Sequence, residues 1–117
     1  MAVGNALGRR GEEIAAAFIR DSGMRILERN WRCREGEVDI LARDGDTLVA
    51  VEVKTRSGDR YGTALEAVTP EKVARLYGLA TRWLAGSSER FARVRVDVVA
   101  LERFAGEFVL RHERGVS

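Results

Sequence analysis

The sequence predicts an α/β fold in which helices flank a mixed central sheet. Runs rich in β-branched and aliphatic residues alternate with turn signals, as strands of a sheet do. Two amphipathic stretches have the spacing of helices, and the second lies between the third and fourth strand candidates. That position requires a crossover, which returns the fourth strand parallel to the third with the usual right-handed sense. The expected order is therefore helix, three antiparallel strands, helix, strand, and an extra C-terminal strand.

The first helix is expected from about Leu7 to Asp21, because apolar residues recur on one face and Gly23 supplies a stop. Glu12 lies at the flank of the apolar stripe. From there it can reach a site at the edge of the sheet, or it can pair with a nearby arginine on the surface. A first strand, Met24–Arg32, is expected to follow.

A β-hairpin is predicted from the two strand candidates Val38–Ala42 and Thr47–Val53. The turn between them, Arg43–Asp46, contains Asp-Gly, a strong signal for a two-residue hairpin loop. Because side chains alternate along a strand, Val38 and Ile40 are expected on the same face.

Three ionisable residues, Asp39, Glu52 and Lys54, interrupt this otherwise apolar hairpin. Alternation places Glu52 and Lys54 on one face of their strand. If Gly45 is the second central residue of the turn, Glu37 faces Glu52 and Asp39 is its diagonal neighbour. If Gly45 is the first, Asp39 lies directly opposite Glu52. Both registers bring the three ionisable residues to one face.

Ionisable groups on a half-buried sheet are costly unless they are paired or bind a metal. Asp39 and Glu52 offer the carboxylate oxygens that Mg²⁺ prefers, and Lys54 could orient a water or balance charge. A structural ion pair on a solvated sheet face is the alternative. Arginine supplies nearly all cations of the chain, since only Lys54 and Lys72 of the 20 basic residues are lysines. A guanidinium cannot replace an ammonium in every role, which favours a specific use for Lys54.

The stretch Arg56–Val68 is predicted to be a glycine-bearing loop at the end of the third strand. Loops at strand ends commonly carry binding residues. Arg56, Arg60 and Tyr61 could contact phosphate and base, or they could be solvated arginines and a packing tyrosine.

The second helix is expected to begin at Pro70, with Thr69 as its N-cap, and to end at Ala85 before Gly86. Its apolar face is expected to consist of Val73, Leu76, Tyr77, Ala80 and Leu84. Lys72 lies in the first turn, where the helix dipole disfavours a cation. That cost suggests a use for Lys72, such as a phosphate contact.

Two strands complete the predicted sheet. Phe91–Leu101 alternates valines with charged residues, and the short strand Phe108–Arg111 follows a turn at Ala105-Gly106. The single histidine, His112, is expected at the surface.

Length and composition indicate one domain spanning residues 1–117. The net charge is +2, with 18 acidic residues interleaved among the 20 basic ones, which permits nucleic-acid binding without requiring it. The one cysteine, Cys33, excludes an internal disulfide and suits a reducing compartment. The N-terminus lacks a signal core, and no apolar run approaches the ~20 residues of a membrane span. A soluble, cytoplasmic protein is expected.

The order of elements, together with the acidic residues and Glu52-Val53-Lys54, resembles the PD-(D/E)xK superfamily of restriction-endonuclease-like nucleases. Within it the chain resembles the YraN family over nearly its whole length, and archaeal-type Holliday-junction resolvases more distantly. The residues that carry the family resemblance are Gly8, Glu12, Ala15, Gly36-Glu37-Val38-Asp39, Val51-Glu52-Val53-Lys54, Arg56, Val68-Thr69 and Lys72.

The resemblance implies a restriction-endonuclease-like αβββαβ core with a metal-dependent site. The implied ligands of Mg²⁺ or Mn²⁺ are Asp39, Glu52, the backbone carbonyl of Val53, and Glu12 as an additional candidate. The implied catalytic residues are the three carboxylates and Lys54, which would position the attacking water. Val38 stands where the superfamily name expects proline.

The expected function is that of a Mg²⁺- or Mn²⁺-dependent DNA endonuclease, in its sharper form structure-selective in repair or recombination. The alternative is a non-catalytic DNA-binding or scaffolding module that retains the fold. Clustered carboxylates repel phosphate, which favours the enzyme. A small-molecule phosphodiesterase is a weaker alternative, because the sequence has no glycine-rich phosphate loop. The expected partner is DNA, branched DNA included; a homodimer is compatible with the sequence, and no membrane partner is expected.

Overall fold

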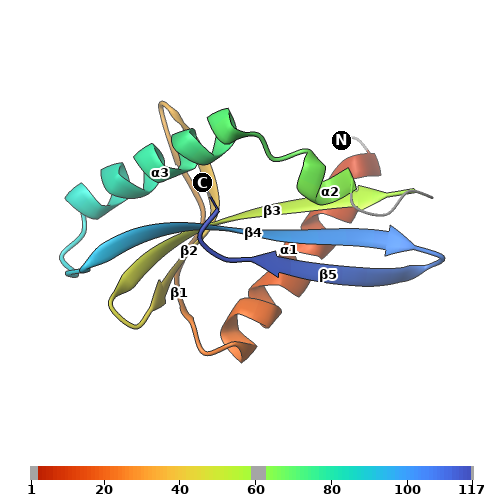
Figure 1. Ribbon diagram of the computed structural model, residues 1–117, viewed down its shortest axis with the longest axis horizontal. Coiled ribbons are helices and arrows are strands. Elements are labelled where there is room, and N and C mark those ends of the chain that lie inside the picture. Colours follow the sequence, from red (N-terminus) through yellow and green to blue (C-terminus); the bar gives the residue numbers. More distant parts are fainter. Residues whose placement is uncertain (1–2, 59–62, 117) are drawn as a thin grey trace.

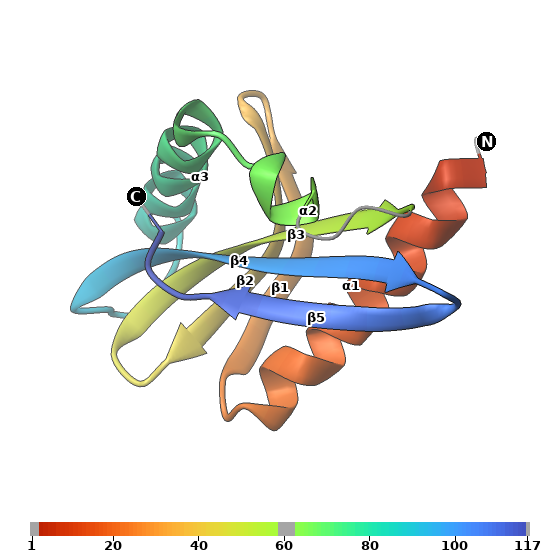
Figure 2. The ribbon, with the colours of Figure 1, turned by 45° about the vertical axis from the view of Figure 1, so that its right-hand side comes forward.

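A five-stranded mixed sheet forms the centre of the molecule. The structure is a computed structural model that describes residues 3–58 and 63–116, with no description of the side chains of residues 3–5. Helix α1 (Val3–Asp21) covers one face of the sheet, and α2 (Thr63–Glu66) and α3 (Pro70–Ala85) cover the other (Figures 1 and 2). The strands are β1 (Arg25–Cys33), β2 (Gly36–Asp44), β3 (Thr47–Ser57), β4 (Arg93–Phe104) and β5 (Glu107–Glu113).

The strand order β1-β2-β3-β4-β5 confirms the predicted αβββαβ core with an extra C-terminal strand. Strands β1, β2 and β3 form an antiparallel meander, and α3 returns β4 parallel to β3. Several bounds differ from the prediction; β4, for example, begins at Arg93 rather than at Phe91 and continues to Phe104. Helix α1 begins at Val3 rather than at Leu7, and the predicted loop after β3 contains the short helix α2. Among the described residues, no helix is long and apolar enough to cross a lipid bilayer.

Each face of the sheet buries its own apolar core. Ala15, Ala16 and Ile19 of α1 pack on one face, and Leu76, Leu79 and Ala80 of α3 pack on the other. The predicted apolar face of α3 was wrong at Tyr77, which is 48% exposed. Leu79 is buried in its place, so the apolar face of α3 is turned about the helix axis relative to the predicted face, and Tyr77 lies outside the buried part.

The turn between β2 and β3 decides the register of the carboxylates. Asp44 pairs with Thr47, so Gly45 and Asp46 are the two central residues. Gly45 has φ +61°, whereas Asp46 is not in the positive-φ region. Glycine at the first central position is typical of a type II′ turn, whose twist matches the flanking strands. Of the two registers that the sequence left open, the structure has the one with Gly45 as the first central residue, and its ladder ends at Ile40–Val51, one pair before Asp39 and Glu52.

The expected alternation fails at one point of β2. Val38 packs in the core under α3, whereas Ile40 packs in the core under α1. The break falls at Asp39, and the register of β1 places Asn30 beside this position, between the pairs Arg29–Ile40 and Trp31–Val38. Asn30 has a left-handed backbone with φ +54°. The two strands therefore kink together beside Asp39.

Strand β3 is paired with β4 along its whole length but with β2 along only part of it. Its pairing with β4 runs from Thr47 to Ser57, but its pairing with β2 ends at Ile40–Val51. Beyond Val51 the β2 side of β3 is no longer covered by a strand ladder. The predicted site residues of β3 lie in this half-covered stretch.

A buried aspartate fixes the C-terminal segment, and it corrects the prediction for His112. The Asp97 side chain is fully buried and accepts hydrogen bonds from Arg95 Nε and His112 Nε2, each at 2.9 Å, and from the Gly115 amide. The His112 side chain is only 8% exposed and packs edge-on against Phe18. Burial acts to raise the pKa of Asp97, but the hydrogen bonds outweigh it and hold that pKa below its usual range.

Candidate functional site

The site forms where β2 and β3 separate. The Asp39 carboxylate bridges the gap by accepting a hydrogen bond from the Val53 amide, with 2.8 Å between Oδ2 and N. This bond occupies the position that a backbone carbonyl of β2 would take in a continued ladder. Glu52 is 8% exposed and lies on the face of β3 opposite Val51 and Val53, which pack under α1. The predicted juxtaposition of Asp39 and Glu52 is present in the structure.

The two carboxylates oppose each other electrostatically. Burial is the first cause that raises the pKa of Asp39, and the charge of Glu52 is the second. Together they lift that pKa to about 7, against the Val53 hydrogen bond, which lowers it. Either a proton on Asp39 or a cation bound between the two carboxylates would remove this repulsion.

The two lysines of the chain approach Glu52 from different elements. Lys54 is half-buried and follows Glu52 by two residues on β3, so the two share a face as predicted. Lys72 reaches the site from the first turn of α3, with its Nζ 3.4 Å from Glu52 Oε2. The structure thus places Lys72 against a carboxylate, and its predicted contact with phosphate stays a prediction.

Glu12 approaches from α1, and a glycine makes this approach possible. Gly11 is buried so closely against β3 that an added Cβ would overlap Thr55 Oγ1. The helix can therefore touch β3 directly beside Lys54. Burial raises the pKa of Glu12, and Glu37 and Glu52 raise it further, while Arg29 lowers it. Glu12 is within electrostatic reach of both Glu52 and Arg29, so each of the two alternatives left open by the sequence describes part of its surroundings.

Glu37 joins this acidic group, although it was not among the predicted site residues and faced Glu52 only in the register that the structure does not adopt. Its charge raises the pKa of both Glu12 and Asp39, and its own side chain pairs with Arg32 at 3.3 Å. Its position two residues before Asp39 on the same strand was the available signal.

A second acidic residue that the sequence did not reveal is Glu102 on β4. It is 5% exposed, and its Oε2 accepts a hydrogen bond from the Ala64 amide at 3.1 Å. This contact attaches α2 to the sheet beside the C-terminal end of β3, where the register pairs Arg56 with Glu102. Glu102 thus fixes α2 against β4 beside this end of β3.

Of the predicted nucleic-acid contacts, the described residues include Arg56 and Lys72. Arg56 is exposed near the end of β3, on the same strand as Lys54. Arg60 and Tyr61 lie outside the described residues. The Arg56 side chain is thus exposed to solvent four residues beyond Glu52 on the same strand.

The oxygen donors of the site fit a hard divalent cation. Across residues 3–58 and 63–116, no three acidic, histidine or cysteine side chains are arranged as a ready-made metal cage. Mg²⁺, however, is usually held by one or two carboxylates and keeps several waters. Asp39 retains Oδ1 for such a role because only Oδ2 is bonded to Val53. The donor chemistry of the pair is therefore compatible with Mg²⁺ or Mn²⁺.

Comparison with known proteins places the chain in a family. A family model described as uncharacterised protein family UPF0102 matches residues 11–101, which include Glu12, the carboxylate pair and both lysines. The chain belongs to the UPF0102 family. The predicted resemblance to the YraN family is thereby confirmed, since the two names denote one family.

Relatives in UPF0102 match nearly the whole chain. The UPF0102 protein of Arthrobacter sp. (strain FB24) is 54% identical over 111 residues, which are 94% of each chain. A UPF0102 protein of Frankia casuarinae is 51% identical over 112 residues, 95% of each chain. That of Rhodococcus opacus (strain B4) is 54% identical over 101 residues, 86% of each chain.

Proposed function

We propose that this UPF0102 protein is a Mg²⁺- or Mn²⁺-dependent endonuclease that hydrolyses phosphodiester bonds of DNA. The observation that carries the proposal is the carboxylate pair of Asp39 and Glu52, held on adjoining strands at the point where their ladder ends. The raised pKa of Asp39, caused first by burial and then by Glu52, means that the pair opposes folding when it is ionised. Such an arrangement is expected where a cation is bound.

The residues of the site have distinct roles in this proposal. Asp39, Glu52 and the carbonyl of Val53 would hold the cation, with Glu12 as an additional ligand. A bound Mg²⁺ or Mn²⁺ would acidify a water and neutralise charge developing on the phosphorus. Lys54 would hold the attacking water in line through its ammonium, which shares the face of Glu52. Arg56 would contact a neighbouring phosphate, because it is exposed on the same strand.

The ion pair between Lys72 and Glu52 favours a second candidate function. An internal ammonium 3.4 Å from Glu52 neutralises that carboxylate without a metal. A DNA-binding module without catalytic activity would keep this ion pair as a structural contact between α3 and β3. In the enzyme, by contrast, Lys72 would release Glu52 when a cation arrives and turn toward phosphate.

A cleavage screen distinguishes these functions. Linear, flap and four-way-junction DNA would be incubated with Mg²⁺ or Mn²⁺, beside Lys54→Ala and the control Arg20→Ala, which alters an exposed arginine at the end of α1. The enzyme predicts cleavage by the parent and by Arg20→Ala, and its loss in Lys54→Ala. No cleavage of any substrate with either metal, combined with retained DNA binding, would establish the module instead. A preference for the flap or the junction would identify branched DNA as the substrate.

A further inference from the structure

We infer that a groove along α3 binds an unpaired DNA strand and leads it to the carboxylate site. This inference rests on the proposed function and specifies its substrate as DNA with a single-stranded segment next to the cleaved bond. Three features carry it: a row of cations on α3, a pair of hollows that share one arginine, and two tryptophans at the far end.

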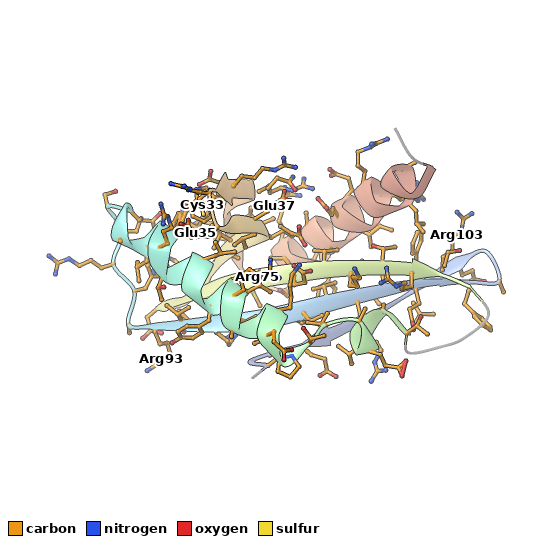
Figure 3. The ribbon with its side chains drawn as sticks, turned by 90° about the horizontal axis from the view of Figure 1, so that it is seen from above. Cys33, Glu35, Glu37, Arg75, Arg93 and Arg103 are labelled. Atoms are coloured by element: carbon orange, nitrogen blue, oxygen red, sulfur yellow. The ribbon has the colours of Figure 1, made fainter. Side chains whose placement is uncertain are left out.

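The cations lie on one side of α3. Lys72, Arg75 and Arg82 follow the i, i+3, i+10 spacing of a single helix face. Lys72 starts the row at the carboxylate site, with Nζ 3.4 Å from Glu52. Arg75 is exposed and forms no ion pair within the part of the chain that is described. Figure 3 shows Arg75 between α3 and the β1–β2 hairpin, from which Glu35 and Glu37 project.

Two hollows continue the row toward the C-terminal end of α3. One, of about 450 Å³, is lined by Arg75 and Arg82 with Leu79 and Glu35. The other, of about 440 Å³, is lined by Arg82 with Trp31 and Trp83. Arg82 borders both, so the two hollows adjoin at its side chain, and together they are called the groove between α3 and the β1–β2 hairpin. The close approach of the hairpin depends on Gly36, where a Cβ would lie 3.3 Å from Leu79.

The two tryptophans pack partly against the core under α3, and the part of each ring that lines the hollow offers a surface on which a base can stack. Trp83 is fixed in orientation, since its Nε1 donates to Glu28 at 2.9 Å and its ring packs edge-on against Phe91. Trp31 comes from the edge strand β1 and lines the same hollow. Aromatic side chains beside a basic groove are the general device for binding single strands, because every base offers a face for stacking. In a duplex the bases stack on one another and are not available to Trp31.

Two acids line the groove, Glu28, which accepts the hydrogen bond from Trp83, and Glu35. Glu35 pairs with Arg82 at 2.9 Å, but both side chains are more than half exposed. Such surface pairs are weak, so a phosphate can replace Glu35 on the guanidinium. The ten-residue separation of Lys72 and Arg82 corresponds to about 15 Å along the helix, or about four nucleotides of a stacked strand.

The test uses tryptophan fluorescence, because the only two tryptophans of the chain line the same hollow. In Trp83→Phe, Trp31 is the sole emitter. Titration with a thymidine oligonucleotide in Ca²⁺ should quench this emission saturably, while a duplex of equal length should quench it far less. No quenching, or equal quenching by the duplex, would overturn the inference.

Two arginines serve as a matched pair in the same titration. Arg82 and Arg93 are both exposed, and each forms a single ion pair with a described residue, but Figure 3 places Arg93 on the side of α3 away from the β1–β2 hairpin. Arg82→Ala should weaken single-strand binding several-fold and reduce the salt slope of log K by about 0.7, the value for one phosphate contact. Arg93→Ala should do neither. Equal effects of both substitutions would contradict the groove.

The outcome separates this inference from the proposed function. Cleavage without quenching of Trp31 leaves the endonuclease intact and refutes the groove. Quenching without cleavage of any substrate retains a strand-binding groove and refutes the endonuclease.

Discussion

Replacement of Asp39 by asparagine should stabilise the protein at alkaline pH. The asparagine side chain keeps an oxygen that can accept the Val53 hydrogen bond, and it removes the charge that opposes Glu52. Burial first, and then Glu52, raise the pKa of Asp39 from 3.8 to about 7. A group with a raised pKa favours the folded state while it is protonated. Its contribution is complete below about pH 4 and is lost as the pH rises to about 7.

The magnitude follows from the same shift. At about 1.4 kcal/mol per pH unit, the rise from 3.8 to about 7 corresponds to a loss of up to about 4 kcal/mol of folding stability above pH 7. Asp39→Asn is therefore expected to be more stable than the parent by up to ~4 kcal/mol at pH 8. The difference should shrink steadily on acidification and vanish near pH 4.

Urea unfolding in EDTA, at a series of pH values from 4 to 8, measures this difference. Asp21→Asn is the matched control, because Asp21 is an exposed aspartate at the end of α1. The control should change the free energy of unfolding by less than ~0.5 kcal/mol at every pH. If Asp39→Asn were less stable than the parent at pH 8, or if its gain did not depend on pH, the opposed carboxylate pair would be refuted.

The same unfolding series, repeated with Mg²⁺ or Mn²⁺ in place of EDTA, tests cation binding. Mg²⁺ or Mn²⁺ should stabilise the parent at pH 8 and less at pH 5, because protons compete for Asp39. Asp39→Asn should gain little at either pH. Equal stabilisation of parent and variant would place the cation elsewhere.

Three further changes test other parts of the structure. Lys54→Arg should bind Mn²⁺ in calorimetry like the parent but cleave ~10²-fold more slowly, because the planar guanidinium misplaces the water; full activity would leave Lys54 only a charge-balancing role. Gly11→Ala should lower the free energy of unfolding by ~1–3 kcal/mol despite the better helix propensity of alanine, because its Cβ overlaps Thr55. In urea unfolding, adding Thr55→Ala should recover much of this loss, and additive effects of the two substitutions would contradict the overlap. Asp97→Ala should cost ~3–5 kcal/mol at pH 7, because Arg95 Nε, His112 Nε2 and the Gly115 amide lose their shared buried acceptor, while Asp44 still pairs with Arg95. The stability that Asp97 contributes should disappear as the pH falls through its lowered pKa, and a small cost at pH 7 would argue against the network.

The order of elements was predictable because strong local signals mark nearly every boundary. Thr69 accepts a hydrogen bond from the Lys72 amide as the predicted N-cap of α3, and the turn at Ala105-Gly106 adopts positive φ at both residues. Strand parity placed Glu52 and Lys54 on one face, because β3 is regular. A helical wheel of the first helix also placed Glu12 at the flank of the apolar stripe, from which it could approach the site.

What the sequence did not reveal depends on irregular backbone and on contacts distant in sequence. The kink beside Asn30 breaks the alternation at Asp39, so Val38 lies on the unexpected face. His112 was expected at the surface, but the C-terminal segment returns to β4, and the partner Asp97 is buried there. The spacing of residues within one strand cannot predict that His112 of β5 contacts Asp97 of β4.

The hydrogen bond between Asp39 and the Val53 amide makes one backbone position a spectroscopic reporter of the site. An amide proton bonded to a carboxylate changes its chemical shift when that carboxylate gains a proton or turns toward a cation. The flanking amides of β3 are tied into a strand ladder and would respond much less. A single labelled valine would therefore display ionisation and cation occupancy directly, in the intact protein and without any substrate.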